Sequence, residues 1–185
     1  MITIGCDVHI HCEYKNETGW HNCDNHVWND VTNKYEFEDL YWGRNYDLFG
    51  ILAGVRSNEY PQIDEPRGLP KDISAKTKEY ADEWEGDAHS HSYITMRELL
   101  RWRDKYTRKW RKLKKKYEVV KCPDQYYGDY IIDDNDKVTF KEEHHMLDYL
   151  ISLLKLKMDN YFYCYEEEDF YNKGDDFRIV FWFDS

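Results

Sequence analysis

The sequence predicts a single α+β domain over residues 1–185: an antiparallel sheet with the N- and C-terminal strands near its centre, and three to four helices packed mainly on one face. Three observations predict this fold. Apolar and polar residues alternate strictly over residues 2–14, residues 177–183 form an apolar strand, and helical apolar spacing recurs between them. A chain of 185 residues is long enough for one domain with its own core.

The first strand, residues 2–14, has an unusual polar face, formed by Asp7, His9, His11 and Glu13. Neighbouring side chains on that face lie about 6.6 Å apart, which is two strand rises. At that separation, adjacent side chains can share one metal ion or one substrate group. The alternative interpretation is an ordinary solvent face of a strand.

The next elements follow from turns, caps and apolar spacing. A turn at residues 15–19 leads into a returning strand over residues 20–31, with a break near residues 23–25. Helices are predicted over residues 46–55, 75–84, 96–117 and 141–157. Asn45 and Ser74 are the N-caps of the first two, and Thr95 with Glu98 has the capping-box spacing that starts the third.

The remaining segments are predicted as connections. A loop with three prolines follows the first helix and is expected to lie over a surface groove. Residues 87–93 are expected to be a polar loop, and residues 130–138 a short strand or turn.

Charge is distributed unevenly along the chain. The net charge of −11 argues against nonspecific nucleic-acid affinity, and no motif for sequence-specific DNA binding is present. Residues 101–116 contain ten Lys or Arg and one acid, a charge of +9, which leaves −20 for the rest of the chain. The net acidity favours a helix whose apolar stripe packs and whose other faces are solvated.

Cysteine usage predicts the cellular setting. The five cysteines are scattered and contain no CxxC, which is typical of neither a disulfide framework nor a zinc ribbon. No apolar run approaches a membrane span, and Asp7 and His9 interrupt any signal peptide at the start. We therefore expect a reduced, cytoplasmic protein without membrane contact, and the sequence leaves homo-oligomerisation open.

The pattern Asp-x-His-x-His occurs twice, at residues 7–11 and 87–91. Histidine with carboxylate is a usual ligand set for metal sites and also supports acid–base catalysis without metal. The candidate catalytic residues are His9, His89, Asp7 and His91. The candidate ligands of one divalent metal, Zn or Mn, are Asp7, His9, Glu13, Asp87 and His89. In the metal-free alternative, Asp7 orients an imidazole.

Three arginines are candidates for binding a small anionic ligand, and one tyrosine is a candidate aromatic contact. They are Arg44, Arg56, Arg67 and Tyr46. Arginine contacts phosphate or carboxylate in bidentate fashion. The alternative is surface arginine that pairs with the acidic body of the protein.

Several short motifs together resemble a known family. They are residues 5–9 (Gly-Cys-Asp-Val-His) with Glu13, 43–46 (Gly-Arg-Asn-Tyr), 53–56 (Ala-Gly-Val-Arg), 67–70 (Arg-Gly-Leu-Pro), 87–92 (Asp-Ala-His-Ser-His-Ser) and 181–184 (Phe-Trp-Phe-Asp). The chain resembles, at both ends and in its first half, a family of small, mostly uncharacterised proteins encoded by bacteriophages, prophages and bacteria. The phage setting implies a counter-defence role, acting on or sequestering nucleotide signals of host defence.

Three functions compete. The first is a phosphodiesterase-like hydrolase acting on a small nucleotide or other phosphate-containing ligand, which the clustered His and Asp favour. The second is a nucleotide-binding protein that sequesters its ligand without turnover. The third is an inhibitor of a protein partner that acts through the basic helix.

Overall fold

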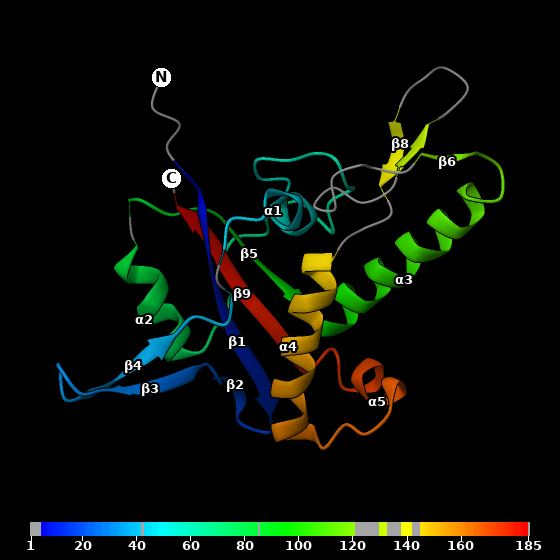
Figure 1. Ribbon diagram of the computed structural model, residues 1–185. Helices are drawn as coiled ribbons and strands as arrows, with labels where there is room; N and C mark the ends of the chain where they lie inside the picture. The colour runs from blue at the N-terminus through cyan, green and yellow to red at the C-terminus, as the bar shows by residue number, and fades with distance from the viewer. Residues whose placement is uncertain are drawn as a thin grey trace.

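The computed structural model describes residues 5–41, 43–84, 86–120, 130–132, 138–141 and 145–184. At its centre is a four-stranded antiparallel sheet in the order β2-β1-β9-β5 (Figure 1). Its strands are β1 (Asp7–Asn16), β2 (Gly19–Asn22), β5 (His89–Thr95) and β9 (Phe177–Asp184). The predicted α+β fold, with both terminal strands at the centre of an antiparallel sheet, is therefore confirmed. Residues 2–4 of the predicted first strand lie outside the described residues.

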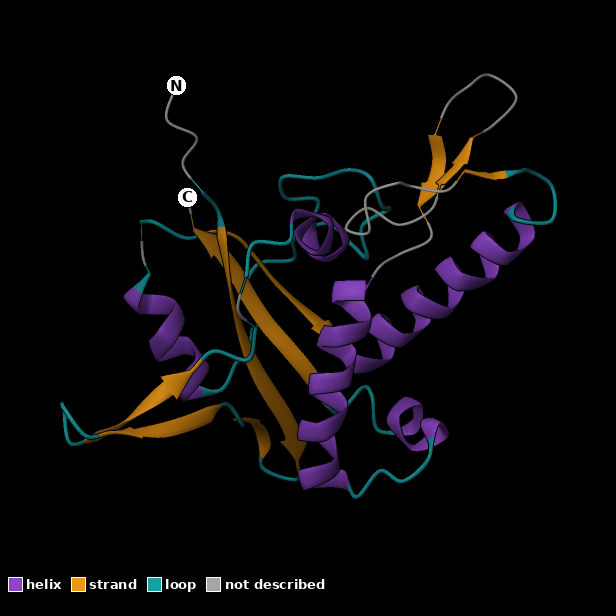
Figure 2. Ribbon diagram, viewed as in Figure 1, coloured by secondary structure: helices purple, strands orange, loops and turns teal. Residues whose placement is uncertain are grey.

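Both sides of the sheet are covered (Figures 1 and 2). One side carries the helices α1 (Tyr46–Ala53), α3 (Met96–Leu113) and α4 (His145–Phe162). The other side carries α2 (Ala75–Glu83) and a hairpin of β3 (Asn25–Asn29) and β4 (Lys34–Glu38). The shorter elements are α5 (Glu167–Asn172), which contacts α3, and a separate sheet of β6 (Val119–Val120), β7 (Tyr130–Ile132) and β8 (Val138–Lys141). Three helices thus share one face, as predicted, while α2 covers the other.

The predicted helix caps are confirmed. Asn45 Oδ1 accepts a hydrogen bond from the N–H of Leu48 at 2.8 Å, and Ser74 caps α2 in the same way. Thr95 and Glu98 form the capping box that starts α3. Compared with the prediction, α3 ends earlier and α4 ends later. None of the helices in the described part of the chain is long and apolar enough to cross a membrane.

Two parts of the topology differ from the prediction. Residues 20–31 do not form one returning strand, because β2 pairs with β1 whereas β3 pairs with β4. Residues 87–93 are not a loop throughout, because from His89 onward they belong to β5 and pair with β9. Ser90, with a φ of 53°, lies in a bulge that breaks the alternation expected of a strand. Because of this irregularity, the sequence pattern of residues 87–93 did not predict the strand.

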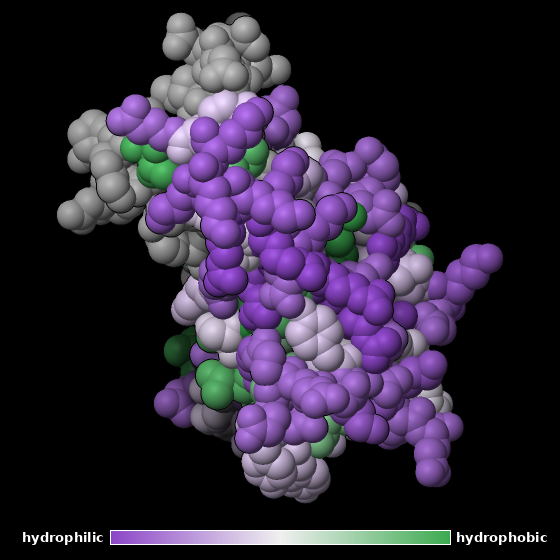
Figure 3. Space-filling model, turned by 90° about the vertical axis from the view of Figure 1, so that its right-hand side faces the viewer, coloured by the Kyte–Doolittle hydropathy of each residue, from purple (hydrophilic) through white to green (hydrophobic). Residues whose placement is uncertain are grey.

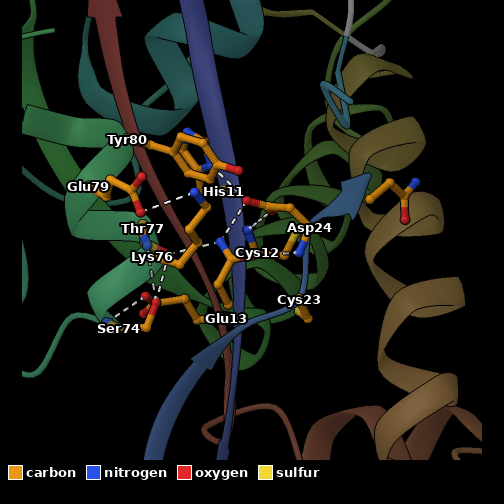
Figure 4. Close-up of polar contacts among 12 residues, drawn as sticks. His11, Cys12, Glu13, Cys23, Asp24, Ser74, Lys76, Thr77, Glu79 and Tyr80 are labelled. Carbon is orange, nitrogen blue, oxygen red and sulfur yellow. Dashed lines mark hydrogen bonds and ion pairs between the residues drawn. The ribbon is translucent and has the colours of Figure 1, made fainter. Parts of the chain in front are cut away.

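A buried ion pair joins the two central strands on the side that faces α2. Glu13 and Arg178 lie opposite each other, and Arg178 Nε donates to Glu13 Oε2 at 2.8 Å. The side chains are 0% and 4% exposed, respectively. Glu13 Oε1 also accepts the backbone N–H of Ser74 at 2.8 Å, which fixes the start of α2 (Figure 4). Arg178 in addition contacts Asp72 and lies 3.8 Å from the ring centroid of Trp20.

We predict that Glu13→Gln lowers the free energy of unfolding by about 3 kcal/mol, because Arg178 would then be buried without its principal carboxylate. Asp72→Asn is the matched control. Asp72 contacts the same guanidinium through a side chain that is 64% exposed, so its loss should cost at most about 1 kcal/mol. Urea unfolding of both variants measures the difference, and equal losses would contradict the central role of Glu13.

Candidate functional site

A cleft lies on the polar face of β1, between β4 and α2. It has a volume of about 410 Å³ and is lined by His9, His11, Phe37, Asp39, Tyr80 and Trp84, among others. Two hollows of about 570 and 560 Å³ also lie along α2, but neither is lined by His9 or His11. The 410 Å³ volume of the cleft that His9 and His11 line suits a small ligand. We refer to this site as the β1–α2 cleft.

His11 forms the inner wall of the cleft and is held rigidly. Its Nδ1 lies 2.7 Å from Asp24 Oδ2, and the backbone N–H of Cys12 donates to the other oxygen of Asp24 at 2.7 Å. The ring of Tyr80 stacks on it from α2 at 4.9 Å (Figure 4). Only 3% of His11 is exposed. A buried carboxylate that accepts Nδ1–H leaves the lone pair of a neutral imidazole on Nε2.

His9 is the more accessible of the two imidazoles. Its side chain is 17% exposed, and its Nε2 lies 3.3 Å from Asp184 Oδ2. The ring of Trp84, directly after α2, lies 4.1 Å away between centroids. When Nε2–H donates to Asp184, Nδ1 is the nitrogen left to exchange a proton.

Asp7 does not orient an imidazole. Both of its carboxylate oxygens accept hydrogen bonds from Arg44, from Nε at 2.6 Å and from Nη2 at 2.7 Å. Hydrogen bonding to Arg44 holds the pKa of Asp7 below its usual value. The room that Gly5 leaves is filled by this guanidinium, since a Cβ at Gly5 would lie 2.1 Å from Arg44 Nη1. The metal-free hypothesis thus needs Asp184 or Asp24 in the role predicted for Asp7.

The other predicted ligand-binding residues, Arg67, Arg56 and Tyr46, do not line the β1–α2 cleft. Arg67 is occupied by Asp64 and Glu98, with nitrogen–oxygen distances of 2.7 Å to each. Arg56 lies near the start of β1, where it interacts with Cys6. Tyr46 begins α1 and is 39% exposed. Two of the three predicted arginines thus hold ion pairs within the fold: Arg67 with Asp64 and Glu98, and Arg44 with Asp7.

The second Asp-x-His segment lies in the same sheet as the first but does not meet it. β9 runs between β1 and β5, which places those two strands about 10 Å apart. The Trp182 ring lies between them, 6.0 Å from His9 and 5.8 Å from His91. His89 contacts Ser90 and Phe183. Burial, and then the charge of His89, lowers the pKa of His91.

The predicted metal ligands are also separated. In the described residues, no three or more His, Cys, Asp or Glu side chains are grouped to hold a metal ion. Asp7 pairs with Arg44, Glu13 pairs with Arg178, and Asp87 is exposed in the turn before β5.

Asp39 is a titratable cleft residue that sequence reasoning missed. It follows β4 and reaches the cleft only because the β3–β4 hairpin folds over β1. Burial raises the pKa of Asp39, while the nearby charges of His9 and His11 partly offset this increase. No local motif marks it, because its position depends on a hairpin that the sequence pattern does not reveal. Asp24 was missed as well, although it directly follows β2, which pairs with β1.

Comparison of the chain with protein-family models, curated proteins and solved structures found no match.

We predict that Asp39→Asn stabilises the protein at neutral pH. A carboxyl whose pKa is raised by folding binds protons more tightly in the folded state, so stability falls as pH rises from about 3.9 through the raised pKa. The asparagine variant lacks this loss. In urea unfolding, the free energy of unfolding of Asp39→Asn should therefore exceed that of the native protein at pH 7, and the difference should vanish below about pH 3.9. Asp30→Asn, at an exposed residue of the hairpin, is the control and should show no such pH-dependent gain.

Proposed function

We propose that the protein is a hydrolase that cleaves a phosphodiester of a small nucleotide in the β1–α2 cleft, by acid–base catalysis. The observation that carries this proposal is the meeting of His9, paired with Asp184, and Asp39, whose pKa is raised, in one cleft. Two titratable groups whose environments differ in this way suit a base and an acid.

In the proposed reaction, His9 takes a proton from water as the water oxygen attacks phosphorus. The bond between phosphorus and the leaving alcohol breaks, and Asp39 donates a proton to the alcohol oxygen. Asp184 holds the His9 ring and stabilises its protonated form. His11, fixed by Asp24, shapes the inner wall. The reaction uses no metal ligand from Asp7 or Glu13, because each of these predicted ligands is paired with an arginine.

The cleft lining supports a ligand with a planar group and few negative charges. Tyr35, Tyr80 and Trp84 line the cleft and provide aromatic surface for a base. Lys76 lines it too, but so do the carboxylates of Glu36 and Glu83. Because carboxylates repel phosphate, the proposal is restricted to a ligand with a single phosphodiester charge at the reacting centre. Arg44 pairs with Asp7, two residues before His9 on β1, and is a candidate for a further phosphate contact.

The resemblance to phage and prophage proteins extends this proposal to a nucleotide signal of host defence, encountered in the cytoplasm of an infected cell. The second candidate function is sequestration of the same ligand without turnover. It is favoured by Trp28 and Tyr35, which are 50% and 70% exposed on the hairpin and available for stacking.

We predict that His9→Ala lowers the turnover of bis(4-nitrophenyl) phosphate by 10²–10⁴-fold, the usual range for a lost acid or base. This compound carries one phosphodiester charge and two planar rings. His21→Ala is the matched control, because His21 lies on β2 and does not line the cleft. The release of nitrophenolate, followed by absorbance, measures the rate, and a panel of cyclic nucleotides extends the test.

Three outcomes separate the candidates. Turnover that is lost in His9→Ala and kept in His21→Ala supports the hydrolase. Nucleotide binding by calorimetry without turnover in the native protein supports sequestration. Turnover that is unchanged in His9→Ala would overturn the assignment of the site.

A further inference from the structure

Helix α3 exposes a straight row of cations that the proposed function does not use. Its members follow one another at intervals of four, three, four and three residues, so they lie on one face of the helix. They are Arg101, Lys105, Arg108, Lys112 and Lys115, and all five are exposed. Lys115 lies two residues beyond the end of α3. The opposite face holds the buried rings of Trp102, Tyr106 and Trp110. We call this row the basic stripe.

The basic stripe is not neutralised within the described part of the chain. Arg103, on its flank, pairs with Asp104 and Glu167, but no described carboxylate lies within ion-pair distance of the stripe residues. Arg108 donates to the backbone oxygen of Asp104 rather than to its carboxylate. Like charges three and four residues apart destabilise a helix. Among the described residues this repulsion is therefore not compensated, and an anionic partner would relieve it.

The composition of the stripe indicates what kind of anion fits it. From Arg101 to Lys115 it extends about 21 Å at 1.5 Å per residue. The surface on this side of the molecule is mainly hydrophilic (Figure 3). The rings of α3 point into the core, so they cannot form the aromatic and apolar centre typical of a protein–protein interface, nor stack on unpaired bases. A row of phosphate groups can bind the stripe by electrostatic attraction, without apolar or stacking contacts.

We propose that the basic stripe binds the backbone of double-stranded nucleic acid through its phosphates, without reading the base sequence. Duplex DNA presents one negative charge per about 1.7 Å of its axis, so several phosphates lie within reach of the stripe. The acidic body does not prevent this contact. α3 leads away from the sheet towards β6 (Figure 1), and charges beyond about 8 Å are largely screened at physiological salt.

The stripe is independent of the cleft. α3 covers one side of the sheet and α2 the other (Figure 1). The β1–α2 cleft is lined from the side of α2 and β4. Substitutions in the stripe should therefore leave hydrolysis at the cleft unchanged, and the two proposals can fail separately.

The test is the salt dependence of binding to a 30-base-pair duplex, followed by fluorescence anisotropy between 50 and 200 mM salt. Five phosphate contacts predict a slope of log K against log salt of about −4.5. The variant Lys105→Gln/Lys112→Gln/Lys115→Gln should reduce this slope to about −1.8, and weaken binding about 500-fold at 0.1 M salt. Glutamine retains helix propensity, and circular dichroism checks that α3 is intact.

The matched control is Lys34→Gln/Lys71→Gln/Lys173→Gln, which removes the same charge from exposed positions outside α3. It should bind the duplex like the native protein. The proposal is overturned if the native protein does not bind, or if both triple variants weaken binding equally. It is also overturned if polyglutamate binds as tightly as the duplex, which would indicate an acidic protein partner. Self-association that is lost in the stripe variant, without duplex binding, would assign the stripe to a second copy of the chain.

Discussion

The arrangement of the sheet and of the cleft depends on the buried ion pair between Glu13 and Arg178. One carboxylate oxygen of Glu13 accepts from Arg178 on β9, and the other accepts from the backbone of Ser74 at the start of α2. The pair thus sets the register of the two central strands and the position of α2 together. Since α2 places Tyr80 against His11 and leads to Trp84 against His9, an ion pair that does not itself line the cleft contributes to its shape.

The remaining polar residues of β1 follow the same rule of pairing. On the polar face of β1, each acidic residue forms an ion pair with an arginine, and each histidine contacts an aspartate. The pairs are Asp7–Arg44, His9–Asp184, His11–Asp24 and Glu13–Arg178. A slip of one residue between β1 and β9 would turn this row towards the apolar helices and bury four polar groups without partners. The polar face therefore specifies the register as strongly as the apolar face does.

The sequence predicted those features that local contacts determine. The capping residues Asn45, Ser74 and Thr95 act within one turn of their own helices, and the alternation of β1 is visible along one strand. The partners of the histidines were not predicted, because they come from other segments. Asp39 reaches β1 through the β3–β4 hairpin, which the sequence predicted as the continuation of β2, whereas Asp24 directly follows β2. The roles predicted for His89 and His91 stay predictions, although β9 separates both from the cleft.

The β1–α2 cleft is lined by acidic side chains and the stripe on α3 is basic, so the two proposed sites favour different anionic ligands. Carboxylates of Glu36 and Glu83 line the β1–α2 cleft and repel a polyanion, whereas a small ligand with one reacting phosphodiester meets less repulsion. The basic stripe has the opposite character, because its attraction grows with the number of phosphates that it neutralises. A nucleic acid is thus favoured on α3 and disfavoured in the cleft. The uneven charge that the sequence carries in residues 101–116 would then keep long and short anions on opposite sides of one sheet.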